Sequence, residues 1–495
     1  MSTASKDIGR FFKHSSIYAI GNVINRIGAF LLLPVYTNYL TVEEYGALEI
    51  FYGVSAVFFG FLSMGIAHAT LRFYFEYSDD KNRQAVVSTN FIASFIVSLL
   101  GVTLIGFWYK ELSVLVFSSE LYSMGVLIIL GTIVFELSSQ ICLAYVRAVE
   151  YSLFFVYLAI AKLVVQVFLN IYLVIYLEEG VVGILLGNFC AVFLGWLILT
   201  GFTLNRCGFA FHYRKLVVIL KYSFPFLLGT ITSLISGNID KFSLNYMDTL
   251  GAVGVYMLAM KFSLIVEQLI GEPFSRSYGS FRFSIMNDKN AMSIQASIVK
   301  YLLYVTVFFA LGVSLFIGEL LFWISDESFW SAGNLVPIIM IASVIKIMNY
   351  PAQTGILYAK KTKYFFYIGV VVAIASTIGN LTMIPLIGVY GACFTLIGVE
   401  ILSLSLMHFQ SQKYFKVEYN YFQLSLSLIV AALLYLSTLL IQFENIYITL
   451  ALKVLIILSY AGLILKSRFF LSSSERLEAD RFIQEKILRI RMNNG

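Results

Sequence analysis

Long apolar runs that recur along almost the whole chain are the feature that most constrains its fold. A helix needs about 20 predominantly apolar residues to cross the hydrocarbon core of a bilayer, and the sequence offers about fourteen such runs, separated by short polar connections. Only 13% of the residues are charged and the mean hydropathy is +0.85, whereas soluble domains average about 25% charged residues. The sequence therefore predicts an all-α integral membrane protein with about 14 transmembrane helices.

The basic residues of the connections predict the orientation of the chain. If successive runs alternate in direction, every Lys and Arg in a connection except Lys110 falls on the side of the two termini, while acids such as Glu43 and Glu178 collect on the other side. Cytoplasmic loops of membrane proteins carry an excess of Lys and Arg, so we expect both termini in the cytoplasm. We expect no cleaved signal peptide, because the first run continues past Leu40 without a small-residue cleavage site.

Two patterns recur in the second half of the chain and indicate an internal duplication. The frame Tyr-x-basic-x-x-x-Tyr occurs at 145–151 and 358–364, and the segments 170–183 and 380–391 both carry an Asn followed by Gly-Val-x-Gly. Six runs separate the copies, so both halves have the same orientation, as in transporters whose parallel repeats rock around a central site. We expect a first six-helix lobe at 1–204, a cytoplasmic inter-lobe loop at 205–216, a second six-helix lobe at 217–412, two extra transmembrane helices at 413–465 and a basic cytoplasmic tail at 466–495.

Charged and amide side chains occur within the apolar runs, where they are costly unless they face a bundle interior or a wet cavity. Helical spacing puts several of them on shared faces, for example Lys162, Gln166 and Asn170. A single stripe of this kind is equally well explained by hydrogen bonds that hold helices together. All the stripes taken together predict a shared polar lumen. Its candidate cations are Arg26, Lys162, Lys241, Lys261, Lys300 and Lys346, its candidate lining amides are Asn22, Gln166, Asn170, Asn238 and Asn245, and acids in the runs include Glu49, Glu136, Asp240, Glu267 and Glu400.

Catalytic and cofactor motifs do not stand out in the sequence. The four histidines fall at or near predicted cytoplasmic helix ends without metal-ligand spacing, and the four cysteines have no paired spacing. No phosphate-binding loop of the GxxxxGK[ST] type occurs. The net charge of +6 is small and dispersed over the loops, which argues against nucleic-acid binding. We therefore expect no enzymatic activity, no metal site, no cofactor and no nucleic-acid partner.

Three segments resemble the polysaccharide-type flippases, the Wzx or O-antigen transporter group. Residues 25–46 read NRIGAFLLLPVYTNYLTVEEYG, residues 239–261 contain IDKF followed by GVYMLAMK, and residues 380–391 contain the Asn and end in GVYG. The resemblance implies the fold of the multidrug/oligosaccharidyl-lipid/polysaccharide exporters, with two six-helix lobes and two extra helices. The family often has Arg after the Asp of its second-lobe motif, where this chain has Lys241. A lysine would contact a phosphate as a point charge, without the bidentate geometry of Arg.

The resemblance also implies a cargo. It implies movement of an undecaprenyl-diphosphate-linked oligosaccharide, an O-antigen or similar repeat unit, from the inner to the outer leaflet of a bacterial plasma membrane. A diphosphate is attracted most strongly by fixed positive charge at low dielectric. The cations expected to bind it are first Arg26, Lys241 and Lys261, then Lys162, Lys300 and Lys346, while Asp240 and Glu49 are candidates for binding a coupling H⁺ or Na⁺.

Partners and alternatives follow from the same resemblance. The expected partners are the lipid-linked oligosaccharide and membrane lipids, with a glycan polymerase and a chain-length regulator as further candidates. An ion-coupled multidrug exporter of the same superfamily is the main alternative, and it would need a net acidic cavity for cationic cargo. A lipid II or teichoic-precursor flippase would share the mechanism and differ only in cargo.

Overall fold

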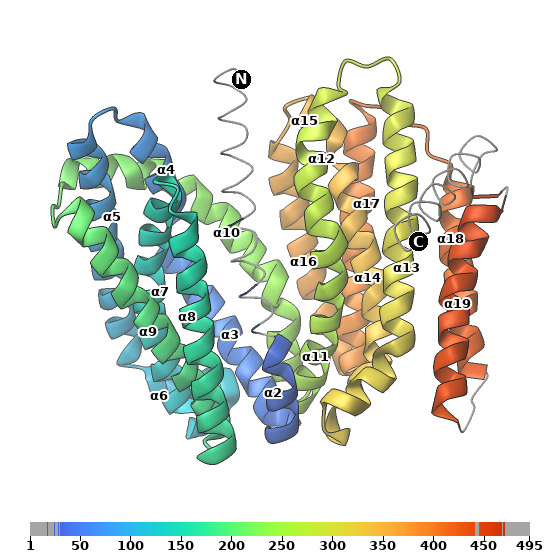
Figure 1. The fold of residues 1–495 in the computed structure, drawn as a ribbon, viewed down its shortest axis with the longest axis horizontal. Helices are drawn as coiled ribbons and strands as arrows, with labels where there is room; N and C mark the ends of the chain where they lie inside the picture. Colours follow the sequence, from blue (N-terminus) through green and yellow to red (C-terminus); the bar gives the residue numbers. More distant parts are fainter. Residues whose placement is uncertain are drawn as a thin grey trace, which may run out of the picture. The chain divides into compact units, whose positions relative to one another are not determined.

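The described part of the chain is entirely helical. The computed structural model describes residues 30–440, 445–467 and 469–470, together with Ile17, Ile24 and Gly28, and these residues contain helices and turns but no β-strand (Figure 1). The chain divides into two compact units. The first unit comprises Met1–Val255 with Ile324–Ser328, and the second comprises Tyr256–Trp323 with Phe329–Gly495.

The first unit is built from long helices joined by short turns. In chain order its described elements are α2 (Leu33–Tyr39), α3 (Val42–Ser63), α4 (Ile66–Glu76), α5 (Asp80–Gly106), α6 (Tyr109–Phe117), the 3₁₀ turn η1 (Glu120–Tyr122), α7 (Ser123–Ala148), α8 (Ser152–Ile171), the π-helical turn η2 (Tyr172–Tyr176), α9 (Gly180–Cys207), α10 (Tyr213–Met247) and the start of α11 (Leu250–Val266).

The second unit begins within α11 and has the same construction. It continues through the π-helical turn η3 (Glu267–Gly271), α12 (Glu272–Ser284), α13 (Ala291–Ile324), α14 (Ala332–Ala352), α15 (Thr354–Tyr358), α16 (Lys363–Ile387), α17 (Val389–Gln412), α18 (Tyr421–Leu440) and α19 (Ile446–Lys466), and the short 3₁₀ turn η4 (Glu327–Phe329) precedes α14.

Twelve helical segments of the described residues are long and apolar enough to cross a membrane. The seventh predicted run, 217–247, corresponds to α10, a single helix from Tyr213 to Met247, which is not among these twelve. The first predicted run, 12–39, lies mostly outside the described residues, and its described end is α2. The protein is therefore an all-α, multi-pass membrane protein, as predicted. The cytoplasmic location of its termini stays a prediction.

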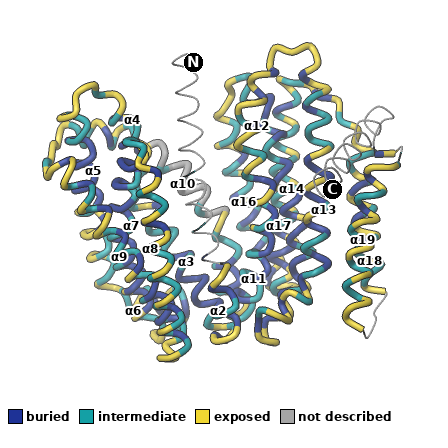
Figure 2. The backbone as a smooth tube through the Cα atoms, in the orientation of Figure 1, coloured by how far each residue is buried: buried dark blue, intermediate teal, exposed yellow. Residues whose placement is uncertain are grey.

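Burial distinguishes central helices from peripheral ones (Figure 2). In the span Glu120–Ala148, which contains α7, 67% of the residues in the most apolar stretch are buried. In the span Glu327–Tyr358, which contains α14, the fraction is 56%. In α18 it is only 6%. Since α18 is apolar yet almost uncovered by protein, its surface suits contact with lipid chains.

Local sequence explains where the second predicted run, 43–71, starts and where it breaks. Thr41 caps α3 through a capping box, because its hydroxyl accepts from the Glu44 amide (3.1 Å) and the Glu44 carboxylate accepts from the Thr41 amide (2.9 Å). The run then breaks into α3 and α4 at Met64 and Gly65, which have φ of 46° and 69°. Glycine adopts this left-handed conformation without the Cβ clash of other residues.

Two hairpins, one in each unit, share the features that suggested a duplication. Asn170 in α8 and Asn380 in α16 are both almost fully buried, at 0% and 1% exposure. The turn that follows each helix uses a glycine with positive φ, Gly180 at 52° and Gly388 at 58°. The compact units divide within α11 rather than in the 205–216 loop, so α10 packs with the first unit. The duplication and the expected lobe boundaries stay predictions.

Backbone contact between α3 and α11 depends on glycine. A Cβ added at Gly46 would lie 1.8 Å from the carbonyl oxygen of Leu250, and one added at Gly254 would lie 2.2 Å from that of Val42. Nine residues before Gly46, the Thr37 hydroxyl donates to the carbonyl of Ile324 (2.9 Å). Two helices approach each other this closely only where glycine occupies the contact.

Replacing Gly46 by Ala tests this contact. The methyl group meets backbone atoms that cannot rotate away, so Gly46→Ala should destabilise the protein by about 1–3 kcal/mol and lower its melting temperature in detergent by several degrees. Gly201→Ala, which meets nothing within 4 Å in α9, is the matched control and should melt like the wild type. Equal melting temperatures for the two variants would show that the glycine contact does not limit stability.

Candidate functional site

The predicted polar stripe of α8 faces neighbouring helices of the first unit. A Cβ at Gly195 of α9 would lie 2.7 Å from the Lys162 side chain. The Gln166 amide donates to Asn188 of α9 (2.6 Å), and the Asn170 amide donates to the Tyr36 hydroxyl of α2 (2.6 Å). The structure thus brings these three predicted residues onto one face.

Gln166 begins a chain of hydrogen bonds across three helices. Asn188, which accepts from Gln166, donates in turn to the hydroxyl of Tyr52 in α3 (2.9 Å). The bonds join α8, α9 and α3. The amides of this stripe therefore hold helices together, which is the packing role that the spacing alone left open.

Lys162 lies beside an acid rather than alone. Glu136 and Gln140 of α7 line the same small cavity as Lys162, with a volume of about 70 Å³, and Ser139 contributes a hydroxyl. Opposite charges that line one small cavity attract each other more strongly than in bulk water. The positive charge of Lys162 is therefore partly compensated inside the first unit.

Lys241 and Glu49 come together at the contact between α10 and α3. Lys241 is 7% exposed and Glu49 is 4% exposed. A Cβ added at Gly53 of α3 would lie 3.2 Å from the Lys241 ammonium nitrogen, and Glu49 lies one turn earlier on the same face of α3. A predicted cation and a predicted coupling-ion candidate thus share one buried helix contact.

The other polar residues of α10 have separate surroundings. The Asn238 amide donates to the carbonyl of Leu234 in its own helix (2.9 Å), whereas the Asn245 amide donates to the carbonyl of Val116 at the end of α6. The Asp240 carboxylate is half-buried and accepts from the backbone amide of Lys241 (2.8 Å). The side chains of Asn238, Lys241 and Asn245 therefore have different neighbours in the structure.

An ion pair lies within the spans of the second unit. The Lys346 ammonium of α14 is 2.8 Å from a carboxylate oxygen of Glu267 in η3, and the Tyr350 hydroxyl donates to the other oxygen at 3.5 Å. The Glu267 side chain is 18% exposed, but that of Lys346 is 47% exposed. The π-helical turn carries the carboxylate towards α14, an arrangement that is common at functional sites.

A second carboxylate adjoins this ion pair. Glu400 of α17 accepts from the Asn349 amide at 3.4 Å, and the Ser403 hydroxyl donates to the Asn349 carbonyl at 3.4 Å. Asn349 is three residues from Lys346 on the same face of α14. The group of Glu267, Lys346, Asn349, Tyr350, Glu400 and Ser403, hereafter the α14 cluster, contains two carboxyl groups and one ammonium group.

The remaining predicted cations do not join the α14 cluster in the contacts that the structure shows. Lys300 lines a separate cavity with Lys289 and Lys416. Lys261 is half-buried on α11. Arg26 and Asn22 lie outside the described residues.

The sequence identified the charged residues of the apolar runs but not the side chains that they contact. It identified Glu136, Glu267 and Glu400 as acids within apolar runs, but did not assign them to particular lysines. It also missed the tyrosine hydroxyls of Tyr36 and Tyr52, because tyrosine is so frequent in this chain that no single one stands out. Among the described residues no group of His, Cys, Asp and Glu is arranged to hold a metal ion.

Known structures share the fold of this chain. A structure titled "Lipid II flippase MurJ, inward closed conformation" matches with a TM-score of 0.72 at 16% identity, over 90% of this chain and 98% of that one. An inward-facing multidrug resistance MATE family transporter of the MOP superfamily matches with a TM-score of 0.57 at 15% identity, over 79% and 93% of the two chains. At these identities the similarity concerns the fold alone.

Sequence comparison identifies the family. A protein named for the Lsg locus of Haemophilus influenzae is 22% identical over 397 residues, which cover 77% of this chain and 95% of that protein. The model of the family described as "Polysaccharide biosynthesis protein" matches residues 11–278, more than half of the chain. The chain belongs to this family of polysaccharide biosynthesis proteins.

Proposed function

We propose that this protein is a flippase for lipid-linked oligosaccharide. It moves an undecaprenyl-diphosphate-linked repeat unit of a surface polysaccharide from the cytoplasmic to the outer leaflet of a bacterial plasma membrane by alternating access. The family match over residues 11–278 and the fold shared with a lipid II flippase and with MATE transporters support this proposal. No step of the transport requires a catalytic group from the protein.

The observation that carries the proposal is the exposure of Lys346. This residue lies 12 residues, about 18 Å, from the end of the span Glu327–Tyr358, yet 47% of its side chain is exposed. A charged side chain exposed at this depth is costly in lipid and therefore adjoins water or a polar ligand. A diphosphate in transit would find there a cation held in place by Glu267.

Contacts in the first unit support alternating access. Thr37, Asn38 and Gly46 of the predicted first lobe contact Ile324 and Gly254 of the predicted second lobe. Lobes that rock around a central site must break such contacts when that end opens. We assign to them the role of a closure that separates during transport.

For a coupling H⁺ or Na⁺ the candidates are Asp240 and Glu49, as the sequence indicated. Glu49 shares its buried contact with Lys241, so binding a proton there would change the charge balance of the α3–α10 contact. The α14 cluster adds Glu400 as a further carboxyl group beside a lysine.

One observation favours a different cargo. The α14 cluster holds two carboxyl groups for one ammonium, and a net acidic cavity would attract cations rather than diphosphates. An ion-coupled multidrug exporter is therefore the second candidate function. A lipid II or teichoic-precursor flippase would differ from the first proposal in cargo alone.

Removing single lysines tests the need for positive charge. In a host that lacks its own copy of the gene, Lys346→Ala and Lys261→Ala should each lower surface glycan to less than about a tenth of the wild-type amount, because the diphosphate loses an attraction that is strong at low dielectric. Glycan is measured by gel analysis of surface polysaccharide, with protein level followed by immunoblot. Lys361→Ala, at an exposed turn of the second unit, is the control and should retain normal glycan. Normal glycan in both lysine variants would contradict the proposed role of these cations.

Exchanging the ion pair separates a packing role from a cargo role. The double variant Glu267→Lys/Lys346→Glu keeps two opposite charges in contact but moves the ammonium group to η3. If Lys346 serves cargo, protein level should recover relative to Lys346→Glu alone while surface glycan stays below about a tenth of wild type. If the double variant restores both, the pair only holds helices together. Increased sensitivity to cationic drugs in the single variants would favour the exporter alternative.

A further inference from the structure

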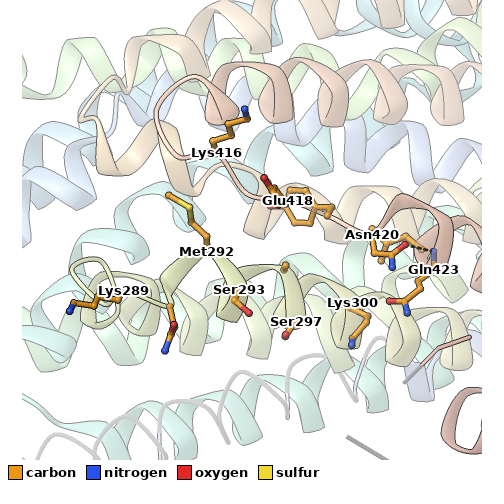
Figure 3. A pocket seen from close by; sticks show the side chains of 13 residues that line it. Lys289, Met292, Ser293, Ser297, Lys300, Lys416, Glu418, Asn420 and Gln423 are labelled. Carbon is orange, nitrogen blue, oxygen red and sulfur yellow. Dashed lines mark hydrogen bonds between the residues drawn. The ribbon is translucent and has the colours of Figure 1, made fainter. Parts of the chain in front are cut away.

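A basic cavity of about 560 Å³ lies at one end of the second unit (Figure 3). One wall is the start of α13, where Ser293, Ser297 and Lys300 are spaced by four and three residues and therefore share one helix face. Lys289, just before α13, and Lys416, in the connection from α17 to α18, complete its basic lining. None of these residues belongs to the α14 cluster.

The cavity carries an excess of positive charge. Lys289, Lys300 and Lys416 face a single acid, Glu418. Among the described residues neither Lys289 nor Lys416 forms an ion pair, and the Lys300 ammonium lies 5.0 Å from the ring centre of Tyr301. An anion that enters this cavity therefore meets ammonium groups on both walls.

Tyr419 connects the basic cavity to an apolar one. Tyr419 and Leu424 line both the basic cavity and an adjoining cavity of about 320 Å³, whose other walls include Val299 and Leu303. Burial raises the pKa of Tyr419 to about 12, so this side chain stays neutral and adds no negative charge. A third, apolar cavity of about 450 Å³ shares Val344 with the second and continues along α13.

The basic cavity and the adjoining apolar cavities together match the charged head and apolar chains of a lipid. The loops on this end carry the basic residues that predict the cytoplasmic side, where the membrane surface is anionic. A molecule with an anionic head and an apolar chain would satisfy the lysines and fill the adjoining apolar cavities together. A soluble phosphate would leave the apolar cavities without an occupant, and the basic tail of the chain, 466–495, carries charge of the wrong sign.

We propose that this cavity binds an anionic phospholipid of the cytoplasmic leaflet. Its phosphate lies among Lys289, Lys300 and Lys416, and an acyl chain enters the apolar cavity lined by Val299 and Leu303. The lipid would bridge α13 and α18, the second of which is almost uncovered by protein. The site is independent of the cargo of the transporter.

Native mass spectrometry of the purified full-length protein tests the site directly. The probes are palmitoyl-oleoyl phosphatidylglycerol and, as the zwitterionic control, palmitoyl-oleoyl phosphatidylcholine. We expect phosphatidylglycerol to bind more tightly than phosphatidylcholine. The triple variant Lys289→Gln/Lys300→Gln/Lys416→Gln should weaken its binding about 100-fold, since each lysine near a membrane surface raises the affinity for an anionic lipid about fivefold. Binding of phosphatidylcholine should not change.

Two further variants control for charge and for folding. Lys360→Gln/Lys361→Gln/Lys363→Gln removes the same charge from exposed residues at another turn of the same unit and should bind phosphatidylglycerol like the wild type. Val299→Trp keeps all three lysines but fills the apolar cavity, and should also weaken binding. A melting temperature within a few degrees of the wild type for every variant shows that the binding changes do not come from unfolding.

Several outcomes would overturn the proposal. Equal losses in the two triple variants would mean a non-specific charge effect, and equal binding of the two lipids by the wild type would mean no recognition of an anionic head. Displacement of phosphatidylglycerol by equimolar inorganic phosphate would assign the cavity to a soluble anion. Displacement by equimolar undecaprenyl phosphate, with phosphatidylglycerol unable to compete in return, would assign it to the cargo.

Discussion

Compensation of charge inside apolar helices is the constraint on which the rest of this structure depends. An isolated ammonium or carboxylate at membrane depth is costly, and the described residues show lysines brought next to acids. Lys346 pairs with Glu267, Lys453 of α19 pairs with Glu319 of α13, and Lys162 shares a cavity with Glu136. Each pairing joins different helices, so the same contacts that neutralise charge also fix which helices pack together. Paired charges therefore shape the packing of the described helices, and the cationic lumen stays a prediction.

Sequence patterns predicted what depends on periodicity and local chemistry. Apolar runs predicted the spans, and the spacing of Lys162, Gln166 and Asn170 predicted their common face. They could not predict partners such as Tyr36 or Asn188, because these depend on which helices become neighbours. For the same reason Lys300, grouped with the other cations by sequence alone, lies instead in a cavity with Lys289 and Lys416. The depth of a residue in a span and the helix face that it shares can be predicted from a sequence, but the neighbours that its side chain meets cannot.

The paired charges matter for the proposed transport function. The hydrogen bonds of Gln166 join neutral amides of neighbouring helices, whereas the ion pair of Lys346 and Glu267 leaves the Lys346 side chain half exposed. Such a group can exchange a protein carboxylate for a phosphate of the cargo without ever being left without a counter-charge. In the proposed function, this exchange is how the α14 cluster would handle an anion even though it holds two carboxyl groups for one ammonium group.

The most direct test of this account is transport by the purified protein alone. Proteoliposomes would be loaded on one leaflet with a fluorescent undecaprenyl-diphosphate oligosaccharide, and its arrival on the other leaflet would be followed by its accessibility to a membrane-impermeant quencher. The account predicts protein-dependent translocation that an excess of unlabelled lipid-linked oligosaccharide slows and that a cationic drug does not. Translocation no faster than in protein-free liposomes, or export of the cationic drug instead, would contradict it.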